Sequence, residues 1–220
     1  MRNKKAKLKT RVVASLGKNA LKDFRAIDGA DMIELRLDLV EDDPVRTLKD
    51  LKEATTLPII ATNRWNLEGG QFAGSERERA LILQRASSYA DYIDIELRAE
   101  FRDDLLEKIS KPAIISYHNF ICTPSDEKLR LILGEISKTR AEIAKIAVTP
   151  TSLKDNLTIL NFLIEADRPL CMIAMGNLGK HLRVISPFYG SVLTFGYVSQ
   201  PTAPGQMSVS ELRQAIKLIS

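Results

Sequence analysis

The chain has 220 residues, of which 45% are hydrophobic and 27% are charged, so it is long enough and apolar enough to bury a sizeable core. No apolar run approaches the roughly 18 residues of a membrane span, and the N-terminus shows no secretory signal, so we expect a cytoplasmic protein with no membrane partner. The net charge of +4 depends on lysines near the N-terminus. With 6% aromatic residues and no basic stripe, the chain is not expected to bind nucleic acid.

Short β-rich runs alternate with segments whose apolar residues recur at helical spacing. The strands are predicted over residues 11–16, 32–38, 58–64, 92–97, 113–118, 143–148, 170–175 and 191–196. The helices are predicted over residues 45–54, 76–89, 103–109, 125–138, 156–165 and 209–219. Strict alternation requires parallel strands joined by crossovers, and eight such units in one chain of about 200 to 250 residues predict an α/β fold of the (β/α)8 TIM-barrel type. A doubly wound open sheet is the alternative.

The domain organisation is predicted to be simple. The sequence contains no linker rich in proline, glycine and serine and no repeat beyond the alternation of strand and helix, so we expect a single domain over residues 1–220. Residues 1–10 are expected to form a basic N-terminal tail within it.

Charged residues alternate with leucines in the second predicted strand, where a parallel strand buried on both faces would be continuously apolar. Glu34, Arg36 and Asp38 share one face of this strand. If the leucines pack against helices, these charges enter the barrel or its mouth and must pair with each other or with a ligand. An ion network that closes the barrel is the other interpretation.

Polar residues recur near the ends of the next three strands. They are Thr62, Arg64, Asp94, Glu96, Arg98, Ser116 and His118. The carboxyl ends of the strands are where a barrel enzyme builds its active site. The loops after the seventh and eighth strands of such barrels often bind an anion, and Arg183 is the candidate for that contact.

Lys145 lies in the apolar stretch 142–149, on the same strand face as Ile143 and Ala147. Burial disfavours the charged ammonium, so we expect the pKa of Lys145 to be lowered and the neutral, nucleophilic amine to be accessible. Taken alone, the stretch also fits an edge strand whose lysine reaches solvent.

A buried lysine near an imidazole is suited to Schiff-base chemistry. The amine condenses with a ketone or aldehyde, and the iminium acidifies the neighbouring C–H, which His118 can deprotonate. Cys122, Cys171, His118 and His181 lack metal-ligand spacing, and the sequence contains no cofactor motif, so we expect neither a metal nor a cofactor.

Four segments on four different predicted strand–helix units resemble the signature segments of the type I 3-dehydroquinate dehydratases. They are residues 34–38 (ELRLD), 115–120 (ISYHNF), 144–147 (AKIA) and 203–206 (APGQ). The resemblance extends over residues 11–207. It implies a (β/α)8 barrel, a homodimer, and dehydration of the small-molecule substrate 3-dehydroquinate to 3-dehydroshikimate in the shikimate pathway.

The resemblance also implies a role for individual residues. Lys145 is the expected Schiff-base lysine, His118 the general acid and base, and Glu68 the carboxylate that orients this histidine. The expected substrate-binding residues are Ser15, Glu34, Arg36, Arg64, Arg183, Thr202 and Gln206. Two alternatives remain open: a class I Schiff-base aldolase, which phosphate dependence would favour, and a non-catalytic barrel that binds anions.

Overall fold

The computed structural model of the protein describes residues 9–220. Within this range the strands are β1 (Arg11–Leu16), β2 (Met32–Arg36), β3 (Ile59–Thr62), β4 (Tyr92–Glu96), β5 (Ala113–Asn119), β6 (Ala141–Val148), β7 (Leu170–Ala174) and β8 (Leu193–Tyr197). All of them are parallel to their neighbours, in the order β7-β6-β5-β4-β3-β2-β1-β8. The expected basic tail lies outside the described residues except for Lys9 and Thr10, and the Thr10 hydroxyl donates to the carbonyl of Ser191 at 2.6 Å.

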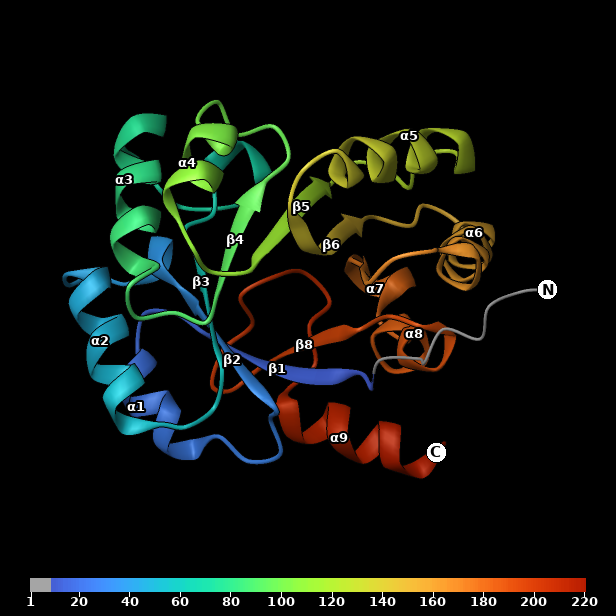
Figure 1. Cartoon of the computed structure of the whole chain (residues 1–220). Coiled ribbons are helices and arrows are strands. Elements are labelled where there is room, and N and C mark those ends of the chain that lie inside the picture. Colours follow the sequence, from blue (N-terminus) through green and yellow to red (C-terminus); the bar gives the residue numbers. More distant parts are fainter. Residues whose placement is uncertain (1–8) are drawn as a thin grey trace.

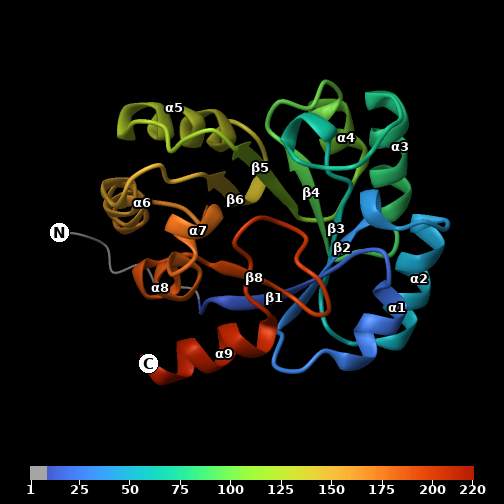
Figure 2. The same ribbon diagram turned by 180° about the vertical axis from the view of Figure 1, so that it is seen from behind.

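The helices lie outside the strands (Figure 1). They are α1 (Ala20–Asp23), α2 (Pro44–Ala54), α3 (Glu76–Ala86), α4 (Arg102–Lys108), α5 (Asp126–Ser137), α6 (Leu153–Glu165), α7 (Gly176–Gly179), α8 (Leu182–Tyr189) and α9 (Val209–Leu218). Seen from behind, the loop between β8 and α9 crosses the centre of the ring (Figure 2). No helix among residues 9–220 is long and apolar enough to cross a membrane.

The barrel closes where β7 meets β8. Leu170 and Ser191 form a parallel bridge, and Val192 N–H donates to the Leu170 carbonyl at 3.0 Å. The Ser191 hydroxyl accepts the Met172 N–H at 3.1 Å and donates to the Leu193 carbonyl at 3.0 Å. A side chain thus supplements the sparse backbone bonding at this seam. The sheet is a nearly closed barrel, so the (β/α)8 prediction is confirmed and the open-sheet alternative is wrong.

The two faces of each strand belong to different cores. Ile33 and Leu35 of β2 pack in the large apolar cluster that also contains Leu48 and Leu51 of α2. A second cluster fills one end of the barrel interior. Its buried members are Val13, Met32, Ile60, Ile114, Ile143, Cys171, Val192, Leu193 and Phe195. Glu34 and Arg36 therefore point into the barrel, as the alternation in this strand predicts.

Side-chain caps fix where several barrel helices begin. The Asp43 carboxylate accepts the N–H groups of Val45 and Arg46 ahead of α2. Ser75 with Glu78 forms a capping box at the start of α3. Satisfying these otherwise unpaired N–H groups stabilises each helix start.

Three helices were not predicted: α1, α7 and α8. The first two have four residues each, which is too short to show a helical period. The third contains Pro187, and it follows α7 after a two-residue connection. Strands β2 and β3 each end two residues earlier than predicted, so Asp38 lies in the 3₁₀ turn η2 (Leu37–Leu39) and Arg64 lies in the loop after β3.

Candidate active site

Lys145 lies in the interior of the barrel. Its strand, β6, is hydrogen-bonded to β5 on one side and to β7 on the other, so the edge-strand alternative is wrong. The residue is 4% exposed. Its Nζ lies 2.9 Å from Oδ2 of Asp94, 3.5 Å from Oε1 of Glu34 and 4.4 Å from the ring centroid of Phe195. The amine is therefore bracketed by two carboxylates and one aromatic face.

Glu34 is fixed by two hydroxyl groups on neighbouring strands. Ser15 Oγ donates to Oε2 at 2.8 Å, and Thr62 Oγ1 donates to Oε1 at 3.0 Å. β1 and β3 flank β2, so the two hydroxyls approach the carboxylate from either side. In the strand register Ser15 is level with Glu34, and Thr62 is level with Arg36, the next inward residue of β2. Glu34 is thus held in one orientation towards Lys145.

Arg36 forms a bidentate pair with Asp38. Its Nε and Nη2 donate to the two carboxylate oxygens at 2.9 and 2.7 Å. Burial lowers the pKa of Arg36 and raises that of Asp38, but the pairing outweighs burial and moves both pKa values the other way. Asp38 also accepts the backbone N–H groups of Arg64 and Gln71. The remaining arm of Arg36 donates to the Thr202 carbonyl at 3.2 Å and so contacts the loop after β8.

Arg64 is almost fully engaged by the interior of the barrel. It donates to Asp94 at 2.7 Å, to Glu96 at 2.8 Å and to the Ser116 hydroxyl at 2.8 Å. Burial opposes the charge, but the surrounding carboxylates raise the pKa of Arg64, so it stays a cation. Arg98, predicted on the same strand face as these carboxylates, instead lies beyond the end of β4 with its guanidinium over the Tyr117 ring.

His118 is held by Glu68. The distance from Nδ1 to Oε2 is 2.8 Å, and the same oxygen accepts the His118 backbone N–H at 3.0 Å. Burial, Arg64 and Lys145 lower the pKa of His118 well below 6.5, so the imidazole is neutral near pH 7. Burial also raises the pKa of Glu68 to about 7. A neutral imidazole with Nδ1 occupied leaves Nε2 available as a base.

The loop after β3 brings Glu68 to this position. Glu68 ends the 3₁₀ turn η3 (Asn66–Glu68), and Gly69 follows with φ 79°. A Cβ atom on Gly69 would lie 2.3 Å from the Phe120 ring, and one on Gly70 would lie 1.9 Å from the Arg64 carbonyl oxygen. The two glycines therefore allow the chain to turn close against the end of β5, where His118 lies.

Arg183 differs from the other two arginines. It lies in the first turn of α8, is 4% exposed, and donates to the carbonyls of Pro204 at 3.0 Å and Phe195 at 3.4 Å. Its Nε has no hydrogen-bond partner, and no carboxylate among residues 9–220 forms an ion pair with it. Burial accordingly lowers the pKa of Arg183 to about 10. A buried guanidinium without a counter-charge is a site for an anion.

The loop after β8 is closed by Gln206. Its Oε1 accepts the Thr202 N–H at 2.7 Å and the Thr202 hydroxyl at 3.1 Å, and its Nε2 lies 3.5 Å from Ser15 Oγ. Gly205, with φ 69°, passes close to the backbone of Gly176, where a Cβ atom would lie 2.5 Å from the carbonyl oxygen. The loop is thus tied to itself, to β1 and to the start of α7.

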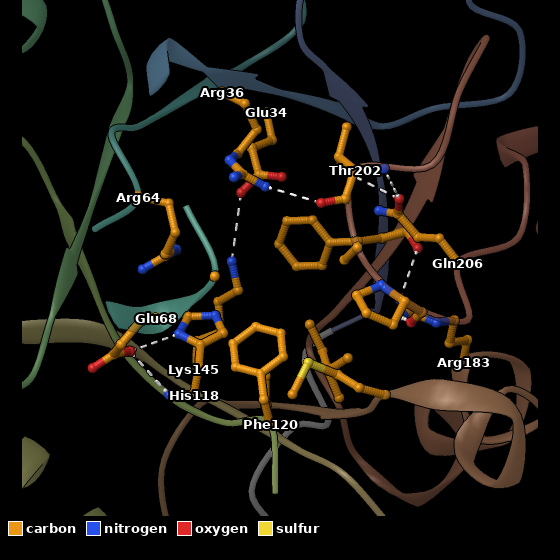
Figure 3. Close-up of a pocket in the computed structure, with 17 residues that line it drawn as sticks. Glu34, Arg36, Arg64, Glu68, His118, Phe120, Lys145, Arg183, Thr202 and Gln206 are labelled. Atoms are coloured by element: carbon orange, nitrogen blue, oxygen red, sulfur yellow. Dashed lines mark hydrogen bonds and ion pairs between the residues drawn. The ribbon is translucent and has the colours of Figure 1, made fainter. Parts of the chain in front are cut away.

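These groups surround one pocket of ≈ 550 Å³, a volume that includes open solvent at its mouth (Figure 3). Nine of the ten predicted site residues line it: Glu34, Arg36, Arg64, Glu68, His118, Lys145, Arg183, Thr202 and Gln206. Ser15 does not line it and contributes through Glu34. The sequence analysis assigned no site role to several further lining residues: Gly69, Phe120, Ala147, Phe195, Ala203 and Pro204. For one of these residues, Phe195, the sequence did contain a signal, namely the alternation of faces along the strand that became β8.

The family model described as Type I 3-dehydroquinase matches residues 10–220. The chain belongs to the type I 3-dehydroquinase family. A curated 3-dehydroquinate dehydratase of Methanothrix thermoacetophila is 50% identical over 210 residues, covering 94% of this chain and 91% of the relative. One from Methanocella arvoryzae is 40% identical over 213 residues, covering 95% and 96%.

Solved structures of the type I 3-dehydroquinase family have the same fold. The 3-dehydroquinate dehydratase of Geobacillus kaustophilus superposes with a TM-score of 0.86 at 27% identity, over 96% of this chain and 91% of that one. The type I enzyme of Clostridium difficile, solved with covalently modified comenic acid, gives a TM-score of 0.86 at 28% identity, over 96% and 92%.

No group of three or more His, Cys, Asp or Glu side chains within residues 9–220 is arranged to hold a metal ion.

Proposed function

We propose that the pocket dehydrates 3-dehydroquinate to 3-dehydroshikimate through a Schiff base on Lys145. The chain is a type I 3-dehydroquinate dehydratase, a hydro-lyase of the shikimate pathway that leads to aromatic amino acids. The observation that carries the mechanism is that one cavity holds a buried amine, a neutral imidazole and a guanidinium without a counter-charge.

Binding is proposed to begin at Arg183. Its free Nε and buried charge suit the substrate carboxylate, which would supply the missing counter-ion. Arg36, Arg64, Glu34, Thr202 and Gln206 present polar groups to the same cavity and are suited to the hydroxyls of the substrate. Phe195 and Met175 supply apolar surface for the ring. With the carboxylate fixed at Arg183, the ring ketone faces Lys145.

The covalent step joins Nζ of Lys145 to the carbonyl carbon. The carbonyl oxygen leaves as water, and the nitrogen becomes an iminium that withdraws electrons from the ring. His118 is suited to shuttle the protons of this condensation, because its pKa keeps Nε2 unprotonated at neutral pH.

The elimination uses the same imidazole. His118 removes a proton from the carbon next to the iminium, and the electron pair forms the ring double bond as the β-hydroxyl departs. That hydroxyl takes a proton from the imidazolium and leaves as water. Hydrolysis of the product imine then restores the Lys145 amine and the imidazole. Glu68 holds the imidazole of His118 in position through its contact with Nδ1 at each stage.

Borohydride trapping with 3-dehydroquinate tests this proposal. The reduced adduct is expected on Lys145 by intact mass and peptide mapping, together with ultraviolet absorbance from the conjugated enone product. The Lys145→Met variant is expected to give neither adduct nor turnover. Normal turnover by that variant would eliminate the covalent mechanism, and phosphate-dependent carbon–carbon cleavage would instead favour the aldolase alternative.

We also propose that the enzyme is a homodimer. Leu153, Leu157 and Ile164 lie on one face of α6 and are 69%, 61% and 61% exposed. Antiparallel packing of α6 against a second copy, centred after residue 160, would place Leu157 opposite Ile164. This apolar contact would then form twice, as two-fold symmetry requires.

Light scattering after size exclusion tests the dimer. The wild type is expected to have the mass of two chains and Leu157→Glu the mass of one. Leu218→Glu, an equally drastic change at a residue that is 85% exposed on α9, is expected to remain dimeric. A monomeric wild type would rule the proposal out.

We also propose that the enzyme works in the cytoplasm. Both cysteines, Cys122 and Cys171, are free thiols, which suits a reducing compartment. Fractionation of the source cells, with 3-dehydroquinate dehydratase activity followed in each fraction, tests this location.

A further inference from the structure

Asp94 is the nearest carboxylate to the proposed Schiff-base nitrogen, but it does not line the pocket. Its side chain is fully buried on β4, and its Oδ2 lies 2.9 Å from Nζ of Lys145. Glu34, which does line the pocket, is 3.5 Å from the same nitrogen. The nitrogen is therefore flanked by Glu34 on the pocket side and by Asp94 on a side that the substrate does not reach.

Asp94 is fixed from more than one direction. Its Oδ1 accepts Arg64 Nη2 at 2.7 Å and the Ser116 hydroxyl at 2.6 Å, which leaves Oδ2 for Lys145. Burial raises the pKa of Asp94, but Arg64 and Lys145 outweigh burial and hold it well below its usual range. The group is a permanent carboxylate with one oxygen directed at the amine.

The charge on the nitrogen explains why a fixed carboxylate suits this position. The neutral amine is the form that attacks, but over the whole step an ammonium and a ketone give an iminium and one water, so the nitrogen carries one positive charge in both end states. Two of the three ammonium protons leave with the carbonyl oxygen as water, and one stays on the iminium nitrogen. A carboxylate on the far side of Nζ can therefore pair with the resting ammonium and with the covalent intermediate without moving.

We propose that Asp94 is a positioning residue that anchors Nζ of Lys145 at the pocket floor and serves as the counter-ion of the iminium intermediate. This role rests on the proposed Schiff base. Asp94 acts through Lys145, so its loss changes how much covalent intermediate accumulates and how fast it turns over, with little effect on the contacts that hold the substrate carboxylate.

Glu96 provides a matched control on the same strand. It is also a buried carboxylate, also accepts a hydrogen bond from Arg64 at 2.8 Å, and also pairs with a second arginine, Arg79. It forms no ion pair with Lys145 among the described contacts. Loss of structural charge pairing in the barrel should affect Asp94→Asn and Glu96→Gln alike, whereas loss of the counter-ion should affect only the first.

The test compares the two variants with the wild type by steady-state kinetics and by borohydride trapping with saturating 3-dehydroquinate. Asp94→Asn is expected to lower kcat and the trapped fraction each by roughly 10- to 100-fold, the range for losing a charged hydrogen bond, with KM within about threefold. Glu96→Gln is expected to keep its trapped fraction within about twofold of the wild type. Equal losses in both variants, or wild-type trapping and kcat in Asp94→Asn, would overturn the proposal.

Circular dichroism and a thermal melt establish that each variant folds. If Asp94→Asn does not fold, Ser116→Ala replaces it, because this change keeps the Asp94 charge and removes one neutral donor to Asp94, together with one acceptor of Arg64. A stronger pairing of Asp94 with the iminium should then raise the trapped fraction and lower kcat, and no change in either would overturn the proposal. Failure of the wild type itself to form an adduct on Lys145 would remove the Schiff base, whereas an adduct at the wild-type level in Asp94→Asn would remove only the role of Asp94.

Discussion

Nδ1 of His118 lies 2.8 Å from Oε2 of Glu68, and the same oxygen accepts the backbone N–H of His118. One carboxylate oxygen therefore fixes both the ring and the main chain of the histidine. The other oxygen, Oε1, is buried without a hydrogen-bond partner. Burial raises the pKa of Glu68 to about 7, because the protein does not replace all the hydrogen bonds that water would give the carboxylate.

Replacing Glu68 should therefore change the pH dependence of the enzyme. As the pH rises through about 7, wild-type Glu68 ionises and makes Nε2 of His118 a stronger base, so kcat/KM should increase over this range. Glu68→Gln keeps the shape of the side chain but cannot ionise, and its kcat/KM should lack that increase. A pH profile of both proteins from pH 5.5 to 9 checks this, and identical profiles would contradict it.

The same shift predicts an effect on stability with a definite sign. The folded-state pKa of Glu68, about 7, is above the ordinary value of 4.5, so the contribution of Glu68 to stability is fully present below pH 4.5 and is lost as the pH rises through 7. Glu68→Gln should therefore gain stability relative to the wild type between pH 5 and pH 8, by up to about 3 kcal/mol. Urea unfolding at the two pH values measures the difference, and a relative loss at pH 8 would contradict the assignment.

His118→Asn should separate imine formation from elimination. General acid–base catalysis contributes about 10²- to 10⁴-fold, so kcat should fall by that amount while Lys145 still forms the imine. Borohydride should then trap more enzyme than in the wild type under turnover. His181→Asn changes the other, exposed histidine and should leave kcat unaltered. A His118→Asn enzyme with wild-type kcat would exclude His118 as the acid and base.

Strand alternation in the sequence was enough to predict which residues share a face. It put Glu34 with Arg36 and Lys145 with Ile143 and Ala147 because a period of two residues needs no tertiary information, but only the closed barrel shows that these faces are the inner ones. It could not predict where β2 ends, since Asp38 leaves the strand to accept N–H groups from Arg64 and Gln71, which follow the next strand in the chain.

The sequence also could not predict which side chains make contact across the barrel. Asp94 and Glu96 were recognisable as inward-facing, but only the closed barrel shows that Asp94 contacts Lys145 and Glu96 does not. Arg183 was assigned to a loop, whereas it lies in α8, a helix whose eight residues include Pro187. A short helix with an internal proline gives no reliable helical signal.

Arg183→Gln should weaken substrate binding far more than it slows the chemistry. The guanidinium has no carboxylate partner among the described residues, so the variant leaves no buried charge unpaired. Losing a charged hydrogen-bond contact with the substrate carboxylate should raise KM by about 10- to 150-fold. Lys180→Gln removes the same charge at an exposed position nearby and should leave KM unchanged. Equal KM values for Arg183→Gln and the wild type would contradict a carboxylate site at Arg183.

Ser191 should matter for stability because it completes the hydrogen bonding where the barrel closes. Its hydroxyl accepts the Met172 N–H of β7 and donates to the Leu193 carbonyl of β8. Ser191→Ala would leave the buried Met172 N–H without this partner and should reduce the free energy of unfolding by about 1–3 kcal/mol. Ser137→Ala, whose hydroxyl donates to the Leu133 carbonyl at an exposed position, should cost much less. Urea unfolding of the two variants measures the difference, and equal stabilities would mean that β7 and β8 do not depend on the serine for closure.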